Sequence, residues 1–262
     1  MKELSLYNFA LKYLSERIKD DSVLEHYLYL YRSNNLNSLE ETFGRILEHA
    51  KNRRGMPYSI GDLQPLKKLL YNFNPLHVVA NFSGWENIFN HIQDNYQPPG
   101  RMDINNKRNY WVIFCKSIYS GAQFLSRFQN FPEFKNYCNS FVEANSDTRV
   151  AFALLLSREI DGFGFALACD FLKEWVSPQF VKPDTHIRDI FIGTGFSAST
   201  DSDFTICRKL IDFSNKIDKF PYTVDKAFWL VGSGRLHVTN ERLNEVKFKT
   251  SKQDFIKEFN SN

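Results

Sequence analysis

The stretch SREIDGFGFALACDFLKEW, residues 157–175, holds two glycines one residue apart between two apolar segments. Apolar residues recur at helical spacing on both sides of the turn IDGFG, so we expect one helix to end near Glu159 and another to begin directly after Gly164. Gly162 and Gly164 can both adopt positive φ, and neither has a side chain that would keep a second molecule away from the backbone. The first N–H groups of the second helix would be free to bind a phosphate, although a simple helix C-cap explains the same glycines.

A second stretch, KPDTHIRDIF at residues 182–191, reads as the start of a further helix. Pro183 fixes its own φ, and Asp184 is a residue type that commonly accepts the first N–H groups of a helix. A carboxylate with those hydrogen bonds and a helix N-terminus beside it stays ionised. Asp184 can therefore serve as a helix cap, and the same position also suits a catalytic carboxylate that must carry a negative charge.

Taken together, the two stretches resemble the helix-hairpin-helix DNA glycosylase superfamily. That superfamily includes endonuclease III, 8-oxoguanine glycosylases, adenine glycosylases that act on mispairs, and alkylbase glycosylases. Residues 160–164 match the family's hairpin sequence Leu-Pro-Gly-Val-Gly, and residues 183–187 match its Val-Asp-Thr-His-Val stretch. Ala166 lies two residues after the second hairpin glycine, and Asp184 follows it by 18 residues, as in the family. The specific similarity covers residues 148–192.

The resemblance implies a two-lobed all-α fold with the active site in the cleft between the lobes, and it makes Asp184 the catalytic carboxylate. Ala166 occupies the position at which bifunctional members carry a lysine that forms a Schiff base with the sugar. The implied activity is therefore hydrolytic excision of a flipped base that is damaged, mispaired or modified, which leaves an abasic site without cutting the strand. Lys182 and Lys226 could replace the missing lysine, but a surface or phosphate-contacting role explains them more simply.

Two departures from the family pattern affect this interpretation. Asp161 stands where the family often has proline, and an acidic side chain in a phosphate-binding turn is unfavourable unless it points away. The cysteine-rich loop of endonuclease III is missing, so no iron–sulfur cluster is expected. No metal or other cofactor is expected either, except that a monovalent cation could bind at the hairpin.

The resemblance also indicates which residues would contact DNA. Phosphate contacts are expected from the backbone amides of Gly162, Gly164 and Ala166 and from the side chains of Lys182, His186 and Arg188. A weaker expectation places Gln123, Asp225, Lys226 and Trp229 at the base pocket. His186 could equally be structural, Gln123 could simply end a helix, and Trp229 could be buried in a helix that packs on the core. The wedge that fills the gap left by a flipped base is expected in residues 78–85 or at Gln123.

The 262-residue chain is 43% hydrophobic and carries 33 Lys and Arg against 30 Asp and Glu, a net charge of +3. This mildly basic balance permits a polyanionic partner, here double-stranded DNA, without requiring one. Basic clusters occur as KNRR at residues 51–54 and as NKR at residues 106–108, and such short clusters are usually ordinary solvated surface.

The four cysteines are 23, 31 and 38 residues apart, and no CxxC pair is present to form a local metal site. The first residues carry charges throughout and lack the apolar core of a signal peptide. No run approaches the roughly 18 apolar residues that span a bilayer. A reduced, cytoplasmic and nucleoid-associated monomer with no membrane contact is the simplest interpretation.

Helical periodicity dominates the chain, and alternating strand patterns are almost absent, which predicts an all-α protein. Pro-Pro-Gly at residues 98–100 is the strongest linker signal. It divides an N-terminal helical segment, residues 1–100, from a glycosylase core, residues 101–262, in which the hairpin spans 157–175 and the catalytic stretch 181–191. Residues 74–85 are expected to break the helical pattern.

Two further functions fit the same residues. A non-catalytic helix-hairpin-helix protein would bind DNA through the hairpin alone, with Asp184 as a cap only. A glycosylase that removes hypermodified bases from phage DNA would serve antiviral defence rather than DNA repair. A binding hairpin does not require an acid 18 residues downstream, so base excision is the leading hypothesis.

Overall fold

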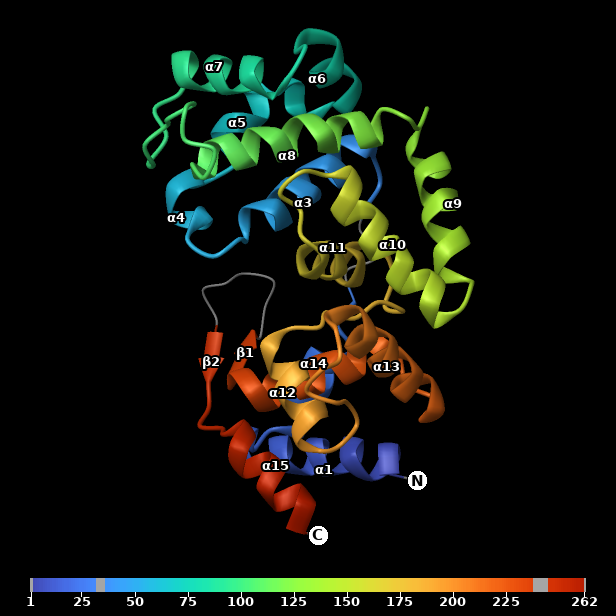
Figure 1. The fold of residues 1–262 in the computed structure, drawn as a ribbon. Helices are drawn as coiled ribbons and strands as arrows, with labels where there is room; N and C mark the ends of the chain where they lie inside the picture. The colour runs from blue at the N-terminus through green and yellow to red at the C-terminus, as the bar shows by residue number, and fades with distance from the viewer. Residues whose placement is uncertain (1, 32–35, 238–244, 262) are drawn as a thin grey trace. The chain divides into compact units, whose positions relative to one another are not determined.

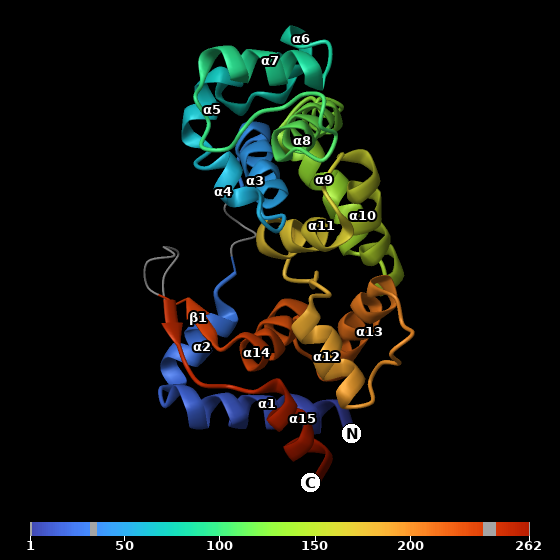
Figure 2. The same ribbon diagram turned by 60° about the vertical axis from the view of Figure 1, so that its left-hand side comes forward.

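The computed structural model describes residues 2–31, 36–237 and 245–261, and within these ranges all regular secondary structure is helical apart from one short antiparallel pair of strands (Figure 1, Figure 2). The all-α class predicted from the periodicity is confirmed. Contacts divide the chain into two compact units, which we call the terminal unit, Met1–Ser33 with Ser177–Asn262, and the central unit, Asn34–Val176. The linker signal at residues 98–100 lies inside the central unit, and a domain boundary at that point stays a prediction.

The central unit is built around α8 (Tyr110–Leu125), which packs against α3 (Leu39–Lys51), α6 (Pro75–Asn81) and α7 (Trp85–Asn95). Figure 1 shows α8 between α3 on one side and α6 and α7 on the other. The apolar periodicity of α8 buries large rings on several sides, since Trp111, Phe114 and Phe124 are all buried. The remaining elements are α4 (Met56–Ile60), α5 (Gln64–Leu69), the 3₁₀ turn η1 (Tyr71–Phe73), α9 (Phe131–Val142), α10 (Ser146–Glu159), α11 (Phe165–Phe171) and the π-helical turn η2 (Leu172–Val176).

The expected helix break at residues 74–85 is wrong for residues 75–81, which form α6, whereas residues 82–84 do separate α6 from α7. The Asn74 side chain accepts a hydrogen bond from the His77 N–H (3.0 Å), and Pro75 occupies the first turn of the helix. Asn-Pro is a turn signal, but the same pair also starts helices. The asparagine side chain accepts a hydrogen bond from a free N–H group of the first turn. Proline has no N–H group, and in the first turn none is needed because the helix offers no acceptor there.

The terminal unit is built around α14 (Pro221–Ser233), which contacts α1 (Lys2–Ile18), α12 (Thr185–Gly193) and α13 (Asp203–Lys216). The rings of Phe191, Phe213 and Phe228 meet in its core with centroids 5.6–5.7 Å apart. The other elements of this unit are α2 (Asp21–Tyr29), the strands β1 (Arg235–His237) and β2 (Glu245–Lys247), and α15 (Lys252–Ser261). The first and last helices pack together, since the Phe9 and Phe255 rings lie 5.3 Å apart. Both ends of the chain therefore belong to one core.

A buried polar chain ties α3 to the helix that follows the hairpin. The Trp175 indole Nε1 donates to His49 Nε2 (3.0 Å), and His49 Nδ1 lies 3.2 Å from an Asp170 carboxylate oxygen. An indole N–H can only donate, so His49 accepts this hydrogen bond at Nε2. This chain fixes the end of α11 and η2 against the core of the central unit.

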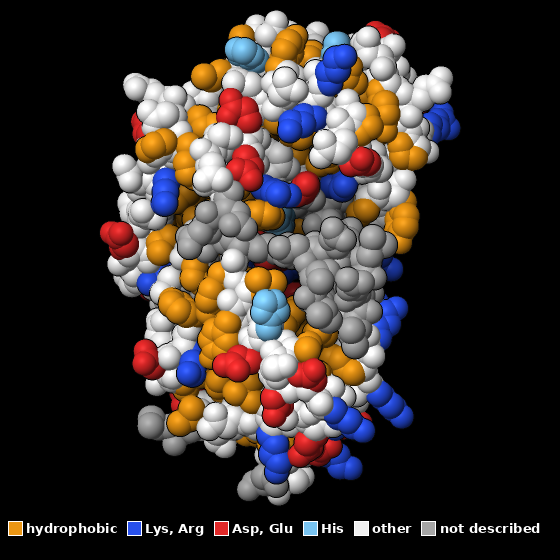
Figure 3. All heavy atoms as spheres, turned by 180° about the vertical axis from the view of Figure 1, so that it is seen from behind, with side chains coloured by type: hydrophobic (Ala, Val, Ile, Leu, Met, Phe, Trp, Pro, Cys, Tyr) orange, Lys and Arg blue, Asp and Glu red, His pale blue; other side chains and the backbone are white. Residues whose placement is uncertain are grey.

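Basic and acidic side chains are interspersed over the face of the protein drawn in Figure 3. Among the described residues of that face, no large area carries charge of a single sign, in keeping with the small net charge. In the described ranges, no helix combines the length and the apolar character that a membrane crossing would need.

Candidate functional site

The predicted hairpin is present in the central unit: α10 ends at Glu159 and α11 begins at Phe165. Ile160 and Phe163 are fully buried, so the apolar positions of the turn point into the core. Two serines of α8 hold the remaining backbone. The Ser117 hydroxyl donates to the Asp161 carbonyl oxygen (2.6 Å), and the Asp161 N–H donates to the Ser120 hydroxyl (2.9 Å). Sequence reasoning missed both serines, because they lie more than forty residues before the turn.

The two hairpin glycines differ in conformation. Gly162 has φ +73°, and a Cβ there would lie 2.8 Å from Ile113 Cγ2 and 2.9 Å from the Ser117 hydroxyl, so the fold itself requires glycine. Gly164 has φ −62° and ψ 160°, so it does not use the positive φ that glycine permits. It is the residue before the first turn of α11, where an extended backbone is normal. A Cβ at Gly164 would meet no atom of the described residues within 4 Å. Packing inside the chain therefore does not explain glycine at this position.

Three hairpin amides are available to a ligand. Within the described part of the chain, the N–H groups of Gly162, Gly164 and Ala166 have no acceptor. Both glycines are exposed and Ala166 is half-buried, so solvent or another molecule must satisfy these donors. These are the amides expected to bind phosphate. Asp161, which directly precedes Gly162 in the turn, is exposed.

Asp184 caps α12 in the terminal unit. Its Oδ1 accepts hydrogen bonds from the N–H groups of His186 (2.9 Å) and Ile187 (3.0 Å), which fixes the carboxylate at the start of the helix. Its Oδ2 has no hydrogen-bond partner among the residues that the structure describes, and the side chain is half-buried. One oxygen is thus oriented by the helix while the other can face a ligand. This geometry suits both of the roles expected for Asp184.

A buried carboxylate supports the loop before Asp184. The backbone N–H of Lys182 donates to Asp225 Oδ2 at 2.6 Å, and Asp225 is only 1% exposed. The expected base-pocket residue Asp225 therefore lies under the 182–184 loop, where it determines the position of the loop backbone.

The other expected pocket residues lie in different environments. Lys226 is 8% exposed, and its ammonium donates to the carbonyl oxygens of Tyr27 (3.0 Å) and Leu30 (3.4 Å). This lysine ties α14 to α2 and the residue after it. Trp229 is half-buried on α14, and Gln123 is exposed near the end of α8 in the central unit.

Arg188 forms hydrogen bonds within the terminal unit. Its guanidinium donates to the Asp203 carboxylate (3.0 Å) and to the carbonyl oxygens of Ser199 (3.2 Å) and Asp201 (2.9 Å). The Lys209 ammonium donates to Asp201 Oδ2 (2.6 Å), and this hydrogen bond is the largest of the causes that lower the pKa of the Asp201 carboxyl to about 2. Arg188 thus holds the loop between α12 and α13, and contact of its side chain with DNA stays a prediction.

His186 packs against α14. A Cβ at Gly232 would lie 2.5 Å from the His186 Cβ, so glycine is needed there for the two helices to approach. The His186 Nδ1 is buried and has no hydrogen-bond partner among the described residues. This packing supports the structural alternative for His186, whereas its contact with DNA stays a prediction.

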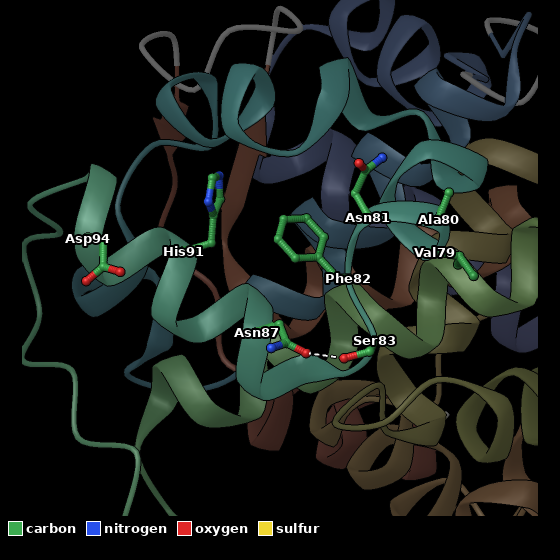
Figure 4. A pocket seen from close by; sticks show the side chains of 8 residues that line it. All are labelled: Val79, Ala80, Asn81, Phe82, Ser83, Asn87, His91 and Asp94. Carbon is green, nitrogen blue, oxygen red and sulfur yellow. Dashed lines mark hydrogen bonds between the residues drawn. The ribbon is translucent and has the colours of Figure 1, made fainter.

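An open polar hollow of about 600 Å³ lies between α6 and α7 (Figure 4). It is lined by Val79, Ala80, Asn81, Phe82, Ser83, Asn87, His91 and Asp94, so it overlaps the segment in which a wedge was expected. The Ser83 hydroxyl donates to the Asn87 side-chain oxygen (2.5 Å), and the Phe82 and His91 rings lie 5.3 Å apart. The hollow offers hydrogen-bonding groups beside two rings.

Within the described ranges, no group of three or more His, Cys, Asp and Glu side chains is placed to hold a metal ion. The four cysteines are buried and form no disulfide with one another. Burial raises the pKa of the Cys115 and Cys138 thiols, which disfavours the reactive thiolate at both positions.

A comparison of the chain with protein-family models, with curated proteins and with solved structures finds no match.

Proposed function

We propose that the protein is a monofunctional DNA glycosylase, which removes a damaged, mispaired or modified base and leaves an abasic site. The observation that carries the proposal is the state of Asp184. Helix α12 fixes one carboxylate oxygen, while the other has no partner in the described residues. A serine or an asparagine would cap the helix equally well, so the negative charge and the second oxygen are what a catalytic role would use.

In the proposed reaction, the hairpin amides of Gly162, Gly164 and Ala166 bind a DNA phosphate and hold the strand. The target base leaves the stack, which exposes its bond to the sugar C1′. As that bond breaks, Asp184 stabilises the positive charge that develops on the sugar and orients a water molecule. The water oxygen bonds to C1′, and its proton leaves through the carboxylate, while the base departs with the bonding electrons and takes up a proton.

Strand cleavage is not part of the proposal. The methyl group of Ala166 cannot form a Schiff base with the sugar. The Lys226 ammonium is buried and donates to two backbone carbonyl oxygens, so it is poorly suited to act as a substitute nucleophile. The expected product is an intact strand with an abasic site, which breaks only on treatment with alkali.

The test is a panel of duplexes that carry oxidised, alkylated, deaminated, mispaired or hypermodified bases, each incubated with the protein and then treated with alkali. We expect alkali-dependent cleavage of at least one duplex by the wild-type protein. Asp184→Asn should keep the fold and DNA binding but release the base at least about 100-fold more slowly, because the negative charge is lost while the shape of the side chain is kept.

Asp254→Asn is the matched control, since Asp254 is an exposed carboxylate on α15 of the same unit. It should excise at the wild-type rate. Wild-type excision by Asp184→Asn would show that this carboxylate has no catalytic role. Salt-sensitive DNA binding without excision from any duplex would favour the non-catalytic alternative.

A further inference from the structure

The two basic clusters noted in the sequence belong to segments that touch in the central unit. Residues 51–54 lead from α3 into α4, and residues 106–108 lead into α8, which α4 contacts (Figure 1). The Tyr110 hydroxyl donates a hydrogen bond to the Arg54 carbonyl oxygen (3.2 Å). A Cβ at Gly55 would lie 2.5 Å from that hydroxyl, so the Tyr110 side chain lies directly against the Gly55 backbone. Segments that are far apart in the sequence therefore form one surface.

Further backbone contacts hold this surface in place. The Gly100 N–H donates to the Ser59 carbonyl oxygen (3.0 Å), and a Cβ at Gly100 would lie 2.7 Å from the Ser59 Cα. The Asn109 side chain donates to the Arg101 carbonyl oxygen (2.9 Å) and closes the loop before α8. The backbone that carries the basic side chains is thus organised before any partner binds, which lowers the entropy cost of binding.

The net positive charge of these two segments exceeds that of the whole chain. Residues 51–62 and 97–110 contain six Lys and Arg and two Asp and Glu, a net charge of +4. The whole chain has a net charge of +3, so all other residues together have a net charge of −1. We call the five exposed cations of the two segments the basic surface: Arg53, Arg54, Arg101, Lys107 and Arg108.

The cations of the basic surface are available to a partner. Among the described residues, Arg53, Arg54, Lys107 and Arg108 form no ion pair. Arg101 lies 3.8 Å from an Asp103 carboxylate oxygen, but its side chain is 88% exposed. Such exposed pairs contribute about 0–1 kcal/mol and are easily exchanged for a stronger anion.

An aromatic ring projects from the same surface. Tyr58 on α4 is 89% exposed, the highest value among the large hydrophobic side chains that the structure describes. Met56 and Ile60 of the same short helix are buried, and glycines with positive φ precede and end it, Gly55 (+83°) and Gly61 (+73°). The helix is therefore anchored on one side while the Tyr58 ring faces solvent. Folding gains nothing from this exposure, whereas an exposed ring among cations provides a stacking surface for an unpaired base.

We propose that Tyr58 and the basic surface bind a nucleic-acid strand with unpaired bases, with phosphates on the cations and a base stacked on Tyr58. This site goes beyond the proposed glycosylase activity, because it requires neither Asp184 nor a modified base. The chemistry that it recognises, a phosphodiester backbone with accessible base faces, is common to single-stranded DNA and RNA.

The test measures binding of the full chain to a short unmodified single-stranded DNA, the same sequence as RNA, a DNA duplex and vesicles rich in anionic lipid, over a range of salt concentrations. Log affinity falls as log salt concentration rises, and each phosphate contact contributes about 0.7 to the steepness of that fall for a single strand. The double variant Arg53→Gln/Arg54→Gln should therefore make the fall less steep by about 1.4. The matched control, Lys67→Gln/Lys68→Gln, removes two exposed cations from α5 of the same unit and should leave the slope unchanged.

Tyr58→Ala should weaken single-strand binding about five-fold or more and duplex binding much less, because only an unpaired base can stack on the ring. Tyr58→Phe keeps the ring and should bind as the wild type does. Equal slopes for Arg53→Gln/Arg54→Gln and its control would overturn the proposal, as would tighter binding to vesicles than to the oligonucleotides. Asp184→Asn should bind the unmodified strand normally, so failure of this site and failure of base excision give different results.

Discussion

At the scale of single residues, the two hairpin glycines separate a structural requirement from a functional one. Gly162→Ala should lower the free energy of unfolding by at least about 1 kcal/mol, because its φ is positive and its Cβ would crowd Ile113 and Ser117. Gly164→Ala should change stability by less than about 1 kcal/mol, since φ is negative and the space around it is open. A methyl group at residue 164 would instead obstruct a phosphate that approaches the amides, so Gly164→Ala should weaken binding to all DNA sequences about equally.

Thermal unfolding and DNA affinity measured on the same two variants check this prediction. The hairpin proposal requires that Gly164→Ala lose more binding than stability. If Gly164→Ala bound DNA as tightly as the wild type, the amides beside it would not be a phosphate site. Wild-type protein without any salt-dependent DNA binding would contradict the hairpin proposal and the glycosylase proposal together.

At the scale of elements, α14 positions the stretch that carries Asp184. Asp225 holds the Lys182 N–H, and Gly232, two turns later on the same helix, makes room for His186. Asp225→Ala should lower the free energy of unfolding by about 1–3 kcal/mol, because it leaves a backbone N–H without its acceptor. Asp254→Ala, an exposed control, should change it by no more than about 0.5 kcal/mol. Urea unfolding measures both values, and equal stability of the two variants would show that the Asp225 hydrogen bond does not hold the loop.

At the scale of the whole molecule, the features that neighbouring residues determine could be predicted from the sequence. The end of α10, the start of α11, the cap at Asp184 and the start of α14 at Pro221 all depend on local signals. The unpredicted features depend on contacts between distant residues: Ser117 with Asp161 across 44 positions, Lys182 with Asp225 across 43, and Lys226 with Tyr27 across 199. Local pattern cannot encode such pairings, because many packings are compatible with the same helices.

The two units have separate cores, which predicts separate effects of matched core mutations. Leu14 of α1 lies in the terminal unit and Leu47 of α3 in the central unit, and both are 0% exposed. Replacing either leucine by alanine should lower the free energy of unfolding of the unit that contains it by about 2–5 kcal/mol, since a cavity remains where the side chain was. Hydrogen exchange checks the prediction: Leu14→Ala should lower the protection of amides in α14, and Leu47→Ala that of amides in α8. Leu14→Ala should therefore impair the helix that supports Asp184 while the hairpin stays folded. Loss of protection in both units from either mutation would show instead that the chain unfolds as one cooperative body.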